Sequence, residues 1–220
     1  MKRYLTPAVE HLRKGDATFG TVLDAVGPCT LRLRRDRFDT LVRSILSQQL
    51  STAAARTIRN RLVDQIGIPR PETLLAVSDE EFRACGVSLQ KASYLRDLAS
   101  RVAEGGLPLN RLGRLGDEEV IERLVAVKGI GRWTAQMFLI FSLGRPDVFP
   151  HDDLGIRNAI RRLYGFSEMP KRDEMDAVAM PWRPYASIAC WYLWQSLSVL
   201  PASEATNGTA LKKNGAAAKP

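Results

Sequence analysis

The stretch Val127–Phe138, "VKGIGRWTAQMF", places two glycines two positions apart between segments with helical patterns. Gly129 and Gly131 allow a tight turn between two helices, with Ile130 packed between them, because glycine adopts positive φ angles at little cost. The helix expected from Arg132 to about Leu143 then begins with unpaired amides at the positive end of its dipole, which favours binding of an anion such as a phosphate. From the spacing alone, an ordinary turn followed by a core aromatic residue explains the pattern too.

The rest of the chain also has helical patterns. Apolar residues recur mostly at intervals of three and four, and alternating runs of Val, Ile and Thr are absent. Ser78 and Glu81 form a capping-box pattern, and Gly86 stops the helix that follows it. The sequence therefore predicts an all-α protein, with a disordered tail at 204–220, where the chain is small, polar and free of aromatic residues.

The composition indicates a basic protein without membrane segments. Lysine and arginine number 32 against 24 acidic residues, which gives a net charge of +8 and favours a polyanionic partner. No apolar run approaches the roughly 20 residues that span a bilayer. Three scattered cysteines and two histidines argue against a disulfide framework, a zinc or iron–sulfur site and a catalytic divalent ion. We expect a cytoplasmic protein, associated with the nucleoid if it is bacterial.

The segment 124–153, "LVAVKGIGRWTAQMFLIFSLGRPDVFPHDD", resembles the helix-hairpin-helix, Gly/Pro-rich loop and aspartate of one superfamily of DNA glycosylases. The similarity continues in "SILSQQLSTAAA", "GVSLQKASYLRDLA" and "PWRPYASIACWYLW", and it is greatest to the DNA-3-methyladenine glycosylase II (alkylbase DNA glycosylase) family. Little chain precedes the first shared helix, so we expect the β-rich N-terminal domain of some members to be absent.

The resemblance implies a two-lobed helical bundle with a helix-hairpin-helix motif and an active site in the cleft between the lobes. The central helical domain would cover 36–144 and end in the helix-hairpin-helix. Both ends of the chain, 1–35 and 145–203, would form the second helical domain.

Two neighbouring carboxylates, Asp152 and Asp153, stand at the start of an expected helix. Aspartate at a helix N-terminus is ordinary capping, and the spacing does not choose between the two. The resemblance places the catalytic aspartate at Asp153, which leaves Asp152 as the cap. A carboxylate stabilises the positive charge that builds on the sugar when an N-glycosidic bond breaks, and it can orient or deprotonate the attacking water.

Trp133 stands where the members that also cut the DNA strand have a lysine, which attacks the sugar to form a Schiff base. Without that amine the nucleophile is water, so the resemblance predicts a monofunctional enzyme with no lyase step. Trp133 and Asp153 are joined by one helix and a loop, so both can face one pocket. A tryptophan face attracts cationic alkylated purines by about 0.5–2 kcal/mol.

The resemblance also assigns further residues, although core packing explains an aromatic stripe as well. The predicted base pocket comprises Trp133, Met137, Leu154 and Trp191. The predicted DNA contacts are Gln49 or Leu50, one of which fills the gap left by a flipped base, and Lys128, Gly129, Ile130, Gly131, Arg132 and Thr134. A polar break between two helices explains "SQQLS" equally well. Backbone carbonyls of Val125, Val127 and Ile130 would hold a structural monovalent cation, and no cofactor is required.

The function implied is hydrolysis of the N-glycosidic bond of alkylated bases in double-stranded DNA, such as 3-methyladenine and 7-methylguanine. The product would be an abasic site for base excision repair, and we expect the enzyme to act as a monomer. Two alternatives stay open: a glycosylase of the same fold for oxidised or mismatched bases, and a non-catalytic helix-hairpin-helix module that only binds DNA.

Overall fold

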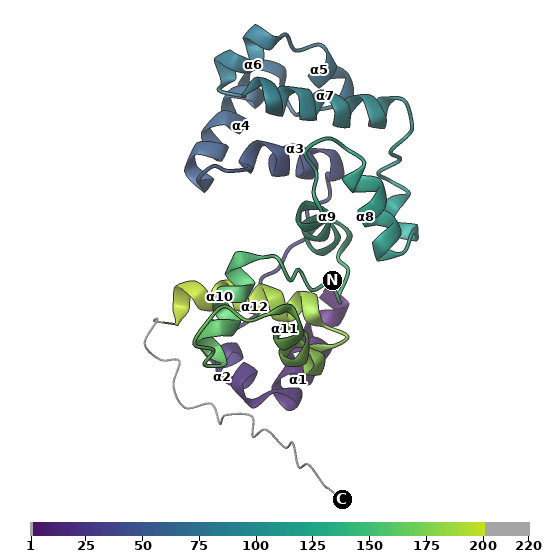
Figure 1. Ribbon diagram of the computed structural model, residues 1–220. Helices are drawn as coiled ribbons and strands as arrows, with labels where there is room; N and C mark the ends of the chain where they lie inside the picture. Colours follow the sequence, from purple (N-terminus) through teal and green to yellow (C-terminus); the bar gives the residue numbers. More distant parts are fainter. Residues whose placement is uncertain (1, 201–220) are drawn as a thin grey trace, which may run out of the picture. The chain divides into compact units, whose positions relative to one another are not determined.

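The computed structural model describes residues 2–200, and every regular element in this range is a helix (Figure 1). The all-α prediction is therefore confirmed. The predicted capping box is also confirmed: the Ser78 amide donates to Glu81 at 2.7 Å, the Glu81 amide donates to the Ser78 hydroxyl at 3.2 Å, and Gly86 ends the helix with a φ of 88°. The predicted disordered tail at 204–220 lies outside the described residues.

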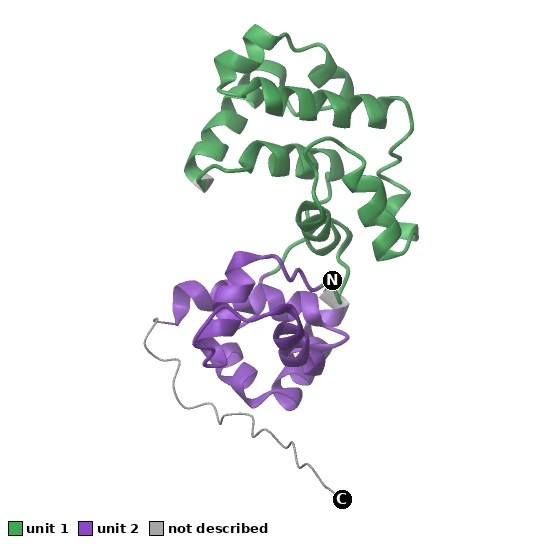
Figure 2. Ribbon diagram, viewed as in Figure 1, with its two compact units in different colours: residues 1, 31–148 green, residues 2–30, 149–220 purple. Residues whose placement is uncertain are grey.

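The chain forms two compact units, which Figure 2 shows in different colours. The first spans Leu31–Val148, and the second combines Lys2–Thr30 with the residues from Phe149 onward. The first contains α3 (Arg37–Ser47), α4 (Thr52–Ile66), α5 (Pro71–Leu75), α6 (Asp79–Cys85), α7 (Leu89–Ala103), α8 (Asp117–Val125) and α9 (Arg132–Phe138), with a 3₁₀ turn at Leu112–Arg114 and a π-helical turn at Leu139–Leu143. The second contains α1 (Lys2–Gly15), α2 (Ala17–Val26), α10 (Leu154–Leu163), α11 (Arg172–Ala179) and α12 (Ala186–Val199), with a 3₁₀ turn at Met180–Trp182.

The unit boundaries differ by a few residues from the predicted limits at 35/36 and 144/145. Residues 31–35 belong with the first unit because the Arg34 amide donates to the Phe141 carbonyl at 2.8 Å and the Ser142 hydroxyl donates to the Arg34 carbonyl at 3.2 Å. Residues 145–148 also belong with the first unit, because the Arg145 side chain pairs with Asp117 at 3.2 Å.

The core of the first unit is built on α3. The helical stripe that the sequence predicts there is buried and comprises Phe38, Leu41, Val42, Ile45 and Leu46. This face lets α3 pack against α4, α7 and α9. α3 therefore lies beside both of the segments that the sequence assigns to DNA contact, the one that follows α3 itself and the turn that precedes α9.

The core of the second unit is built on α12 and the aromatic residues around it. Trp182 and Tyr192 are fully or almost fully buried, and the Trp182 ring lies 5.2 Å from that of Phe19. Asp16 caps α2 through the Phe19 amide at 3.1 Å and accepts the indole N–H of Trp182, also at 3.1 Å. Trp182 is therefore a core residue with a satisfied polar atom, as an aromatic stripe at helical spacing suggests.

Candidate active site

Asp153 is the N-cap of α10. Its Oδ1 accepts the Ile156 amide at 2.8 Å, its own amide donates to the Pro150 carbonyl at 3.1 Å, and the residue is 7% exposed. The prediction that Asp152 caps the helix is wrong: Asp152 is exposed, and α10 begins one residue later than that assignment requires. The turn at Pro150 decides the position of the cap, since it leaves Asp153 in extended conformation directly before Leu154.

Trp194, which the sequence analysis did not single out, also binds Asp153. Its indole N–H donates to Asp153 Oδ1 at 2.9 Å, so Oδ1 receives two donors from two different helices. Gly155 allows this approach, because a Cβ there would lie 3.1 Å from Asp153 Oδ1 and 3.1 Å from the indole Cδ1. The carboxylate is therefore fixed in orientation by groups that are themselves fixed by packing.

The loop before Asp153 is held by an aromatic contact and a hydrogen bond. His151 Nε2 lies 2.6 Å from Asp176 Oδ1 on α11, and its ring packs edge-on against Phe149 at 4.7 Å.

Of the predicted pocket residues in this unit, Leu154 is 62% exposed, whereas Trp191 is 8% exposed and packs edge-on against Tyr192 at 5.0 Å. The contacts of Trp191 are those of a core residue.

The hairpin between α8 and α9 uses its two glycines differently. Gly129 has a φ of 77°, and a Cβ there would lie 2.1 Å from Cδ2 of Tyr94, so both the backbone and the packing require glycine. Gly131 has an extended backbone with a φ of −93°, and a Cβ there would meet nothing within 4 Å. The prediction that both glycines serve the turn is therefore wrong for Gly131. Ile130 is 3% exposed, as expected for a residue that packs between the two helices.

At the hairpin, Arg132 forms an ion pair, and Lys128 is exposed. The Arg132 guanidinium binds both carboxylate oxygens of Glu118, at 2.9 and 2.5 Å, and this hydrogen bonding lowers the pKa of Glu118. Lys128 is exposed, and its amide donates to Asp97 Oδ2 at 2.9 Å. Thr134, which is also a predicted DNA contact, is only 5% exposed.

The segment that follows α3 has an unusual backbone. Gln49 is exposed with a φ of 56° and is the one non-glycine residue with positive φ in 2–200. Leu50 beside it is 39% exposed, and Ser51 caps α4. Gln48, which the sequence analysis did not assign, donates through Nε2 to the Gly129 carbonyl at 2.6 Å. Both candidate wedge residues are thus exposed, and the residue before them is tied to the hairpin.

The remaining predicted pocket residues lie on α9. Trp133 is 44% exposed, which is a large exposed aromatic surface, and Met137 is half-buried. Both belong to the first unit and Asp153 to the second. Their meeting in one pocket stays a prediction.

The predicted cation site has a suitable donor set. The carbonyls of Val125, Val127 and Ile130 are neutral oxygens, which hard monovalent cations take as ligands, and Val125 ends α8, where the helix dipole is negative. The Val127 carbonyl accepts the Ile130 amide at 3.1 Å and keeps a second lone pair. The chemistry of these ligands suits a monovalent cation, and the cation site stays a prediction. Within the described residues there is no group of three His, Cys, Asp or Glu side chains placed to hold a metal.

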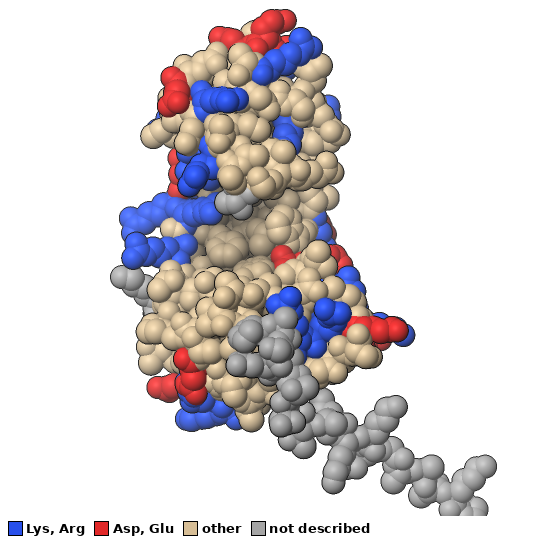
Figure 3. All heavy atoms as spheres, turned by 90° about the vertical axis from the view of Figure 1, so that its left-hand side faces the viewer, with Lys and Arg blue, Asp and Glu red and all other residues tan. Residues whose placement is uncertain are grey.

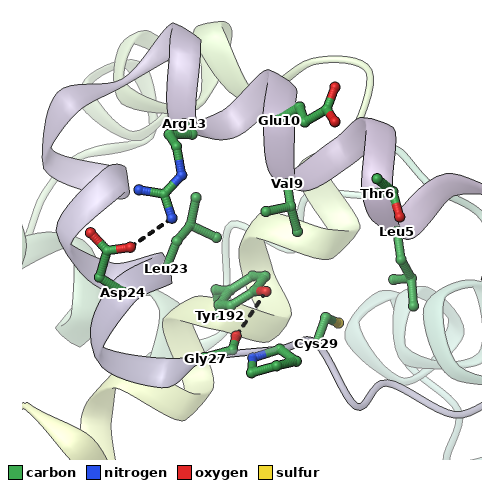
Figure 4. Close-up of a pocket in the computed structure, with 11 residues that line it drawn as sticks. Leu5, Thr6, Val9, Glu10, Arg13, Leu23, Asp24, Gly27, Cys29 and Tyr192 are labelled. Carbon is green, nitrogen blue, oxygen red and sulfur yellow. Dashed lines mark hydrogen bonds and ion pairs between the residues drawn. The ribbon is translucent and has the colours of Figure 1, made fainter.

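A hollow of about 640 Å³ opens in the second unit, beside α1, the end of α2 and Tyr192 of α12 (Figure 4). Two of its charged side chains, Arg13 and Asp24, pair with each other at 2.7 Å, and the Tyr192 hydroxyl donates to the Gly27 carbonyl at 3.1 Å. Burial raises the pKa of Tyr192 to about 12, so it stays a protonated donor. Since none of the predicted catalytic or DNA-binding residues lines this hollow, it is not the candidate site.

None of the helices described between residues 2 and 200 has both the length and the apolar character to cross a bilayer.

The profile of the HhH-GPD superfamily base excision DNA repair proteins matches residues 42–184. DNA-3-methyladenine glycosylase 1 of Schizosaccharomyces pombe is 38% identical, and the match covers 87% of each chain. The alkylbase DNA glycosidase-like protein mag2 of the same yeast is 33% identical over 86% of this chain and 92% of its own.

Two solved structures share the fold. The S. pombe 3-methyladenine DNA glycosylase Mag1 in complex with abasic DNA matches with a TM-score of 0.79 at 36% identity, covering 88% of this chain and 98% of its own. The DNA-3-methyladenine glycosidase of Bacillus halodurans matches with a TM-score of 0.78 at 38% identity, covering 86% and 88%. The chain therefore belongs to the HhH-GPD superfamily of base excision DNA repair proteins.

Proposed function

We propose that this protein is a monofunctional DNA glycosylase that releases alkylated bases, such as 3-methyladenine and 7-methylguanine, from double-stranded DNA. It acts as a monomer without a cofactor and leaves an abasic site. The observation that carries the proposal is Asp153, a mostly buried carboxylate that two donors hold in one orientation. Relatives named as 3-methyladenine glycosylases, at up to 38% identity over most of the chain, support the choice of substrate.

In the proposed reaction the Asp153 carboxylate stabilises positive charge and forms no covalent bond to the sugar. The bond between the sugar and the base lengthens first, and positive charge builds on the sugar ring. Asp153 stabilises that charge and directs a water molecule to the sugar carbon, and its carboxylate accepts the proton that the water loses as the new carbon–oxygen bond forms. An alkylated purine already carries positive charge, so the base leaves as a neutral molecule and needs little acid assistance.

Trp133 gives the proposal its substrate class and its lack of a lyase step. Its large exposed indole face suits a cationic base, since cation–π attraction contributes about 0.5–2 kcal/mol and a neutral base does not gain it. An indole has no amine that can attack the sugar, so no Schiff base forms at this position.

The surface charge supports contact with DNA at separate points. On the face drawn in Figure 3, lysine and arginine side chains gather in several groups with wide uncharged surface between them. Such groups can neutralise individual phosphates. The exposed hairpin around Lys128 and Gly131 supplies one such point in the first unit.

A base-release assay tests the function. We expect the protein to release 3-methyladenine and 7-methylguanine from methylated duplex DNA, measured by chromatography of the free bases. The DNA should then carry alkali-labile abasic sites, and borohydride should trap no covalent protein–DNA adduct. Release from duplexes with 8-oxoguanine or a mismatch instead would favour the oxidised-base alternative. Tight DNA binding without release of any base would favour a binding module.

Trp194 should matter for catalysis although it is not expected to touch the base. Replacing Trp194 with phenylalanine removes the indole N–H that holds Asp153 Oδ1 and keeps the aromatic ring. A hydrogen bond to a charged group contributes about 1.5–3 kcal/mol, so we expect the single-turnover rate of base release to fall about tenfold or more. The dissociation constant for DNA should stay unchanged.

Trp182→Phe is the matched control for Trp194→Phe. It also removes an indole N–H bound to a carboxylate, that of Asp16, and it lies in the same unit. It should lower the thermal unfolding temperature without slowing base release by the folded protein. Equal loss of rate in both variants would show that Trp194 acts only through stability.

A further inference from the structure

One face of α7 contacts both of the segments assigned to DNA. Lys91, Tyr94 and Asp97 are spaced three residues apart, which places their side chains along one side of the helix. Lys91 Nζ donates to the carbonyls of Leu46 at 2.7 Å and Gln48 at 2.9 Å, at the end of α3. Lys91, near the N-terminal end of this face, therefore holds the start of the wedge segment, which we define as Ser47–Ser51.

The rest of this face holds the hairpin. The Tyr94 ring packs so closely on Gly129 that a Cβ there would lie 2.1 Å from it. Asp97 Oδ2 accepts the Lys128 amide at 2.9 Å and also pairs with Arg101 at 2.8 Å. Burial raises the pKa of Asp97, but these bonds outweigh it and lower the pKa, so the carboxylate is charged near neutral pH.

Gln48 closes the arrangement. Its main-chain carbonyl accepts from Lys91, and its side chain donates to the Gly129 carbonyl at 2.6 Å. The residue before Gln49 is thus bound on one side to α7 and on the other to the hairpin. Non-glycine residues seldom adopt positive φ, so the conformation of Gln49 depends on a neighbour that is held in place.

We propose that α7 braces the wedge segment against the hairpin, and that Lys91 is a positioning residue for opening the duplex. The proposal rests on the proposed function, because it takes the wedge segment as the part that enters the duplex. In this role α7 keeps the hairpin, which binds the strand, at a fixed distance from Gln49, which enters the duplex. Neither DNA-contacting segment can fix that distance alone.

Lys91 suits this task through both its charge and its burial. Burial lowers its pKa and no carboxylate is bonded to its ammonium group in the described contacts, so its two carbonyl partners hold it. These carbonyls lie at the C-terminal end of α3, where the helix dipole favours a cation. A neutral side chain of the same length would leave both carbonyls without this donor.

The test compares two substrates that differ only in the cost of flipping. One is a duplex with 7-methylguanine opposite cytosine, and the other has the same lesion opposite thymine, where less pairing must be broken. Lys91→Met should lower the single-turnover rate about tenfold on the paired substrate and less than about threefold on the mismatched one. Lys91→Arg should restore most of the rate, since it keeps the charge.

Two further variants serve as checks. Lys14→Met removes the same charge from an exposed site in the second unit and should leave both rates unchanged. Gln48→Ala removes the link to the Gly129 carbonyl without altering α7, and should reproduce the substrate-dependent loss even if Lys91→Met folds poorly. The proposed brace would be overturned if Lys91→Met and Gln48→Ala slowed base release equally on both substrates, or if neither variant slowed it.

A fluorescence measurement separates the brace from the proposed function. With 2-aminopurine at the target position, wild-type protein should raise the fluorescence on binding as the base leaves the stack, and Lys91→Met should raise it less at saturation. This readout needs no base release. If wild-type protein opens the duplex but releases no alkylated base, the proposed function fails and the brace stands. Equal fluorescence for the wild type and Lys91→Met overturns the brace alone.

Discussion

Asp153→Asn should abolish base release while leaving the fold and DNA binding intact. Asparagine is as good an N-cap as aspartate, and its Oδ1 can still accept the Ile156 amide and the Trp194 indole. The substitution therefore keeps these two hydrogen bonds at Oδ1, removes the negative charge and turns the second carboxylate oxygen into an amide donor. Because the proposed transition state carries positive charge on the sugar, we expect the single-turnover rate on methylated duplex DNA to fall about 10³-fold or more.

Asp152→Asn is the matched control for this prediction. It makes the same change of charge one residue away, at an exposed side chain, and should keep the rate within about twofold of wild type. Thermal unfolding and DNA affinity, measured on both variants, should match the wild type. Loss of activity in Asp152→Asn but not in Asp153→Asn would place the chemistry on the other carboxylate. Full activity in both would remove the carboxylate from the mechanism.

The helices and their start signals were predictable from sequence because they depend on local patterns. The stripe on α3 and the box formed by Ser78 and Glu81 need only neighbours three or four residues away. The cap of α10 was not predictable, since two adjacent aspartates satisfy the same pattern. The hydrogen bond from the Asp153 amide to Pro150 decides between them, and it depends on the path of the loop.

The residues that hold the predicted site in place could not be predicted from the sequence either, because their contacts are with residues far away along the chain. Trp194 lies one helical turn after Trp191 in "ACWYLW", and only the packing of α12 against α10 shows which indole reaches Asp153. Lys91 contacts carbonyls 43 and 45 residues away in sequence, and carbonyls carry no side-chain signal. The resemblance could assign residues that motifs mark, but not the residues that hold them.

Gly129→Ala should destabilise the protein strongly. The new Cβ would overlap the Tyr94 ring and place alanine at a φ of 77°. The left-handed conformation costs alanine about 1–2 kcal/mol and overpacking adds about 1–3 kcal/mol, which together correspond to a fall of roughly 10 °C in unfolding temperature. Calorimetry or circular dichroism would measure it. An unchanged unfolding temperature would mean that the hairpin does not pack on α7 in this way.

Gly131→Ala should have the opposite profile, with normal stability and weak DNA binding. Its backbone is extended and a Cβ there meets no protein atom within 4 Å, so the fold gives no reason for glycine. A phosphate that approaches the hairpin amides would meet that Cβ, and we expect the dissociation constant for duplex DNA to rise about tenfold at fixed salt. Gly116→Ala is the matched control, because Gly116 also precedes a helix with open space around it, at the start of α8. Fluorescence anisotropy should show a loss of affinity in Gly131→Ala alone. If both alanine variants bind like the wild type, the hairpin does not grip the phosphate through Gly131, and the glycine spacing that marks this motif has no role in DNA contact.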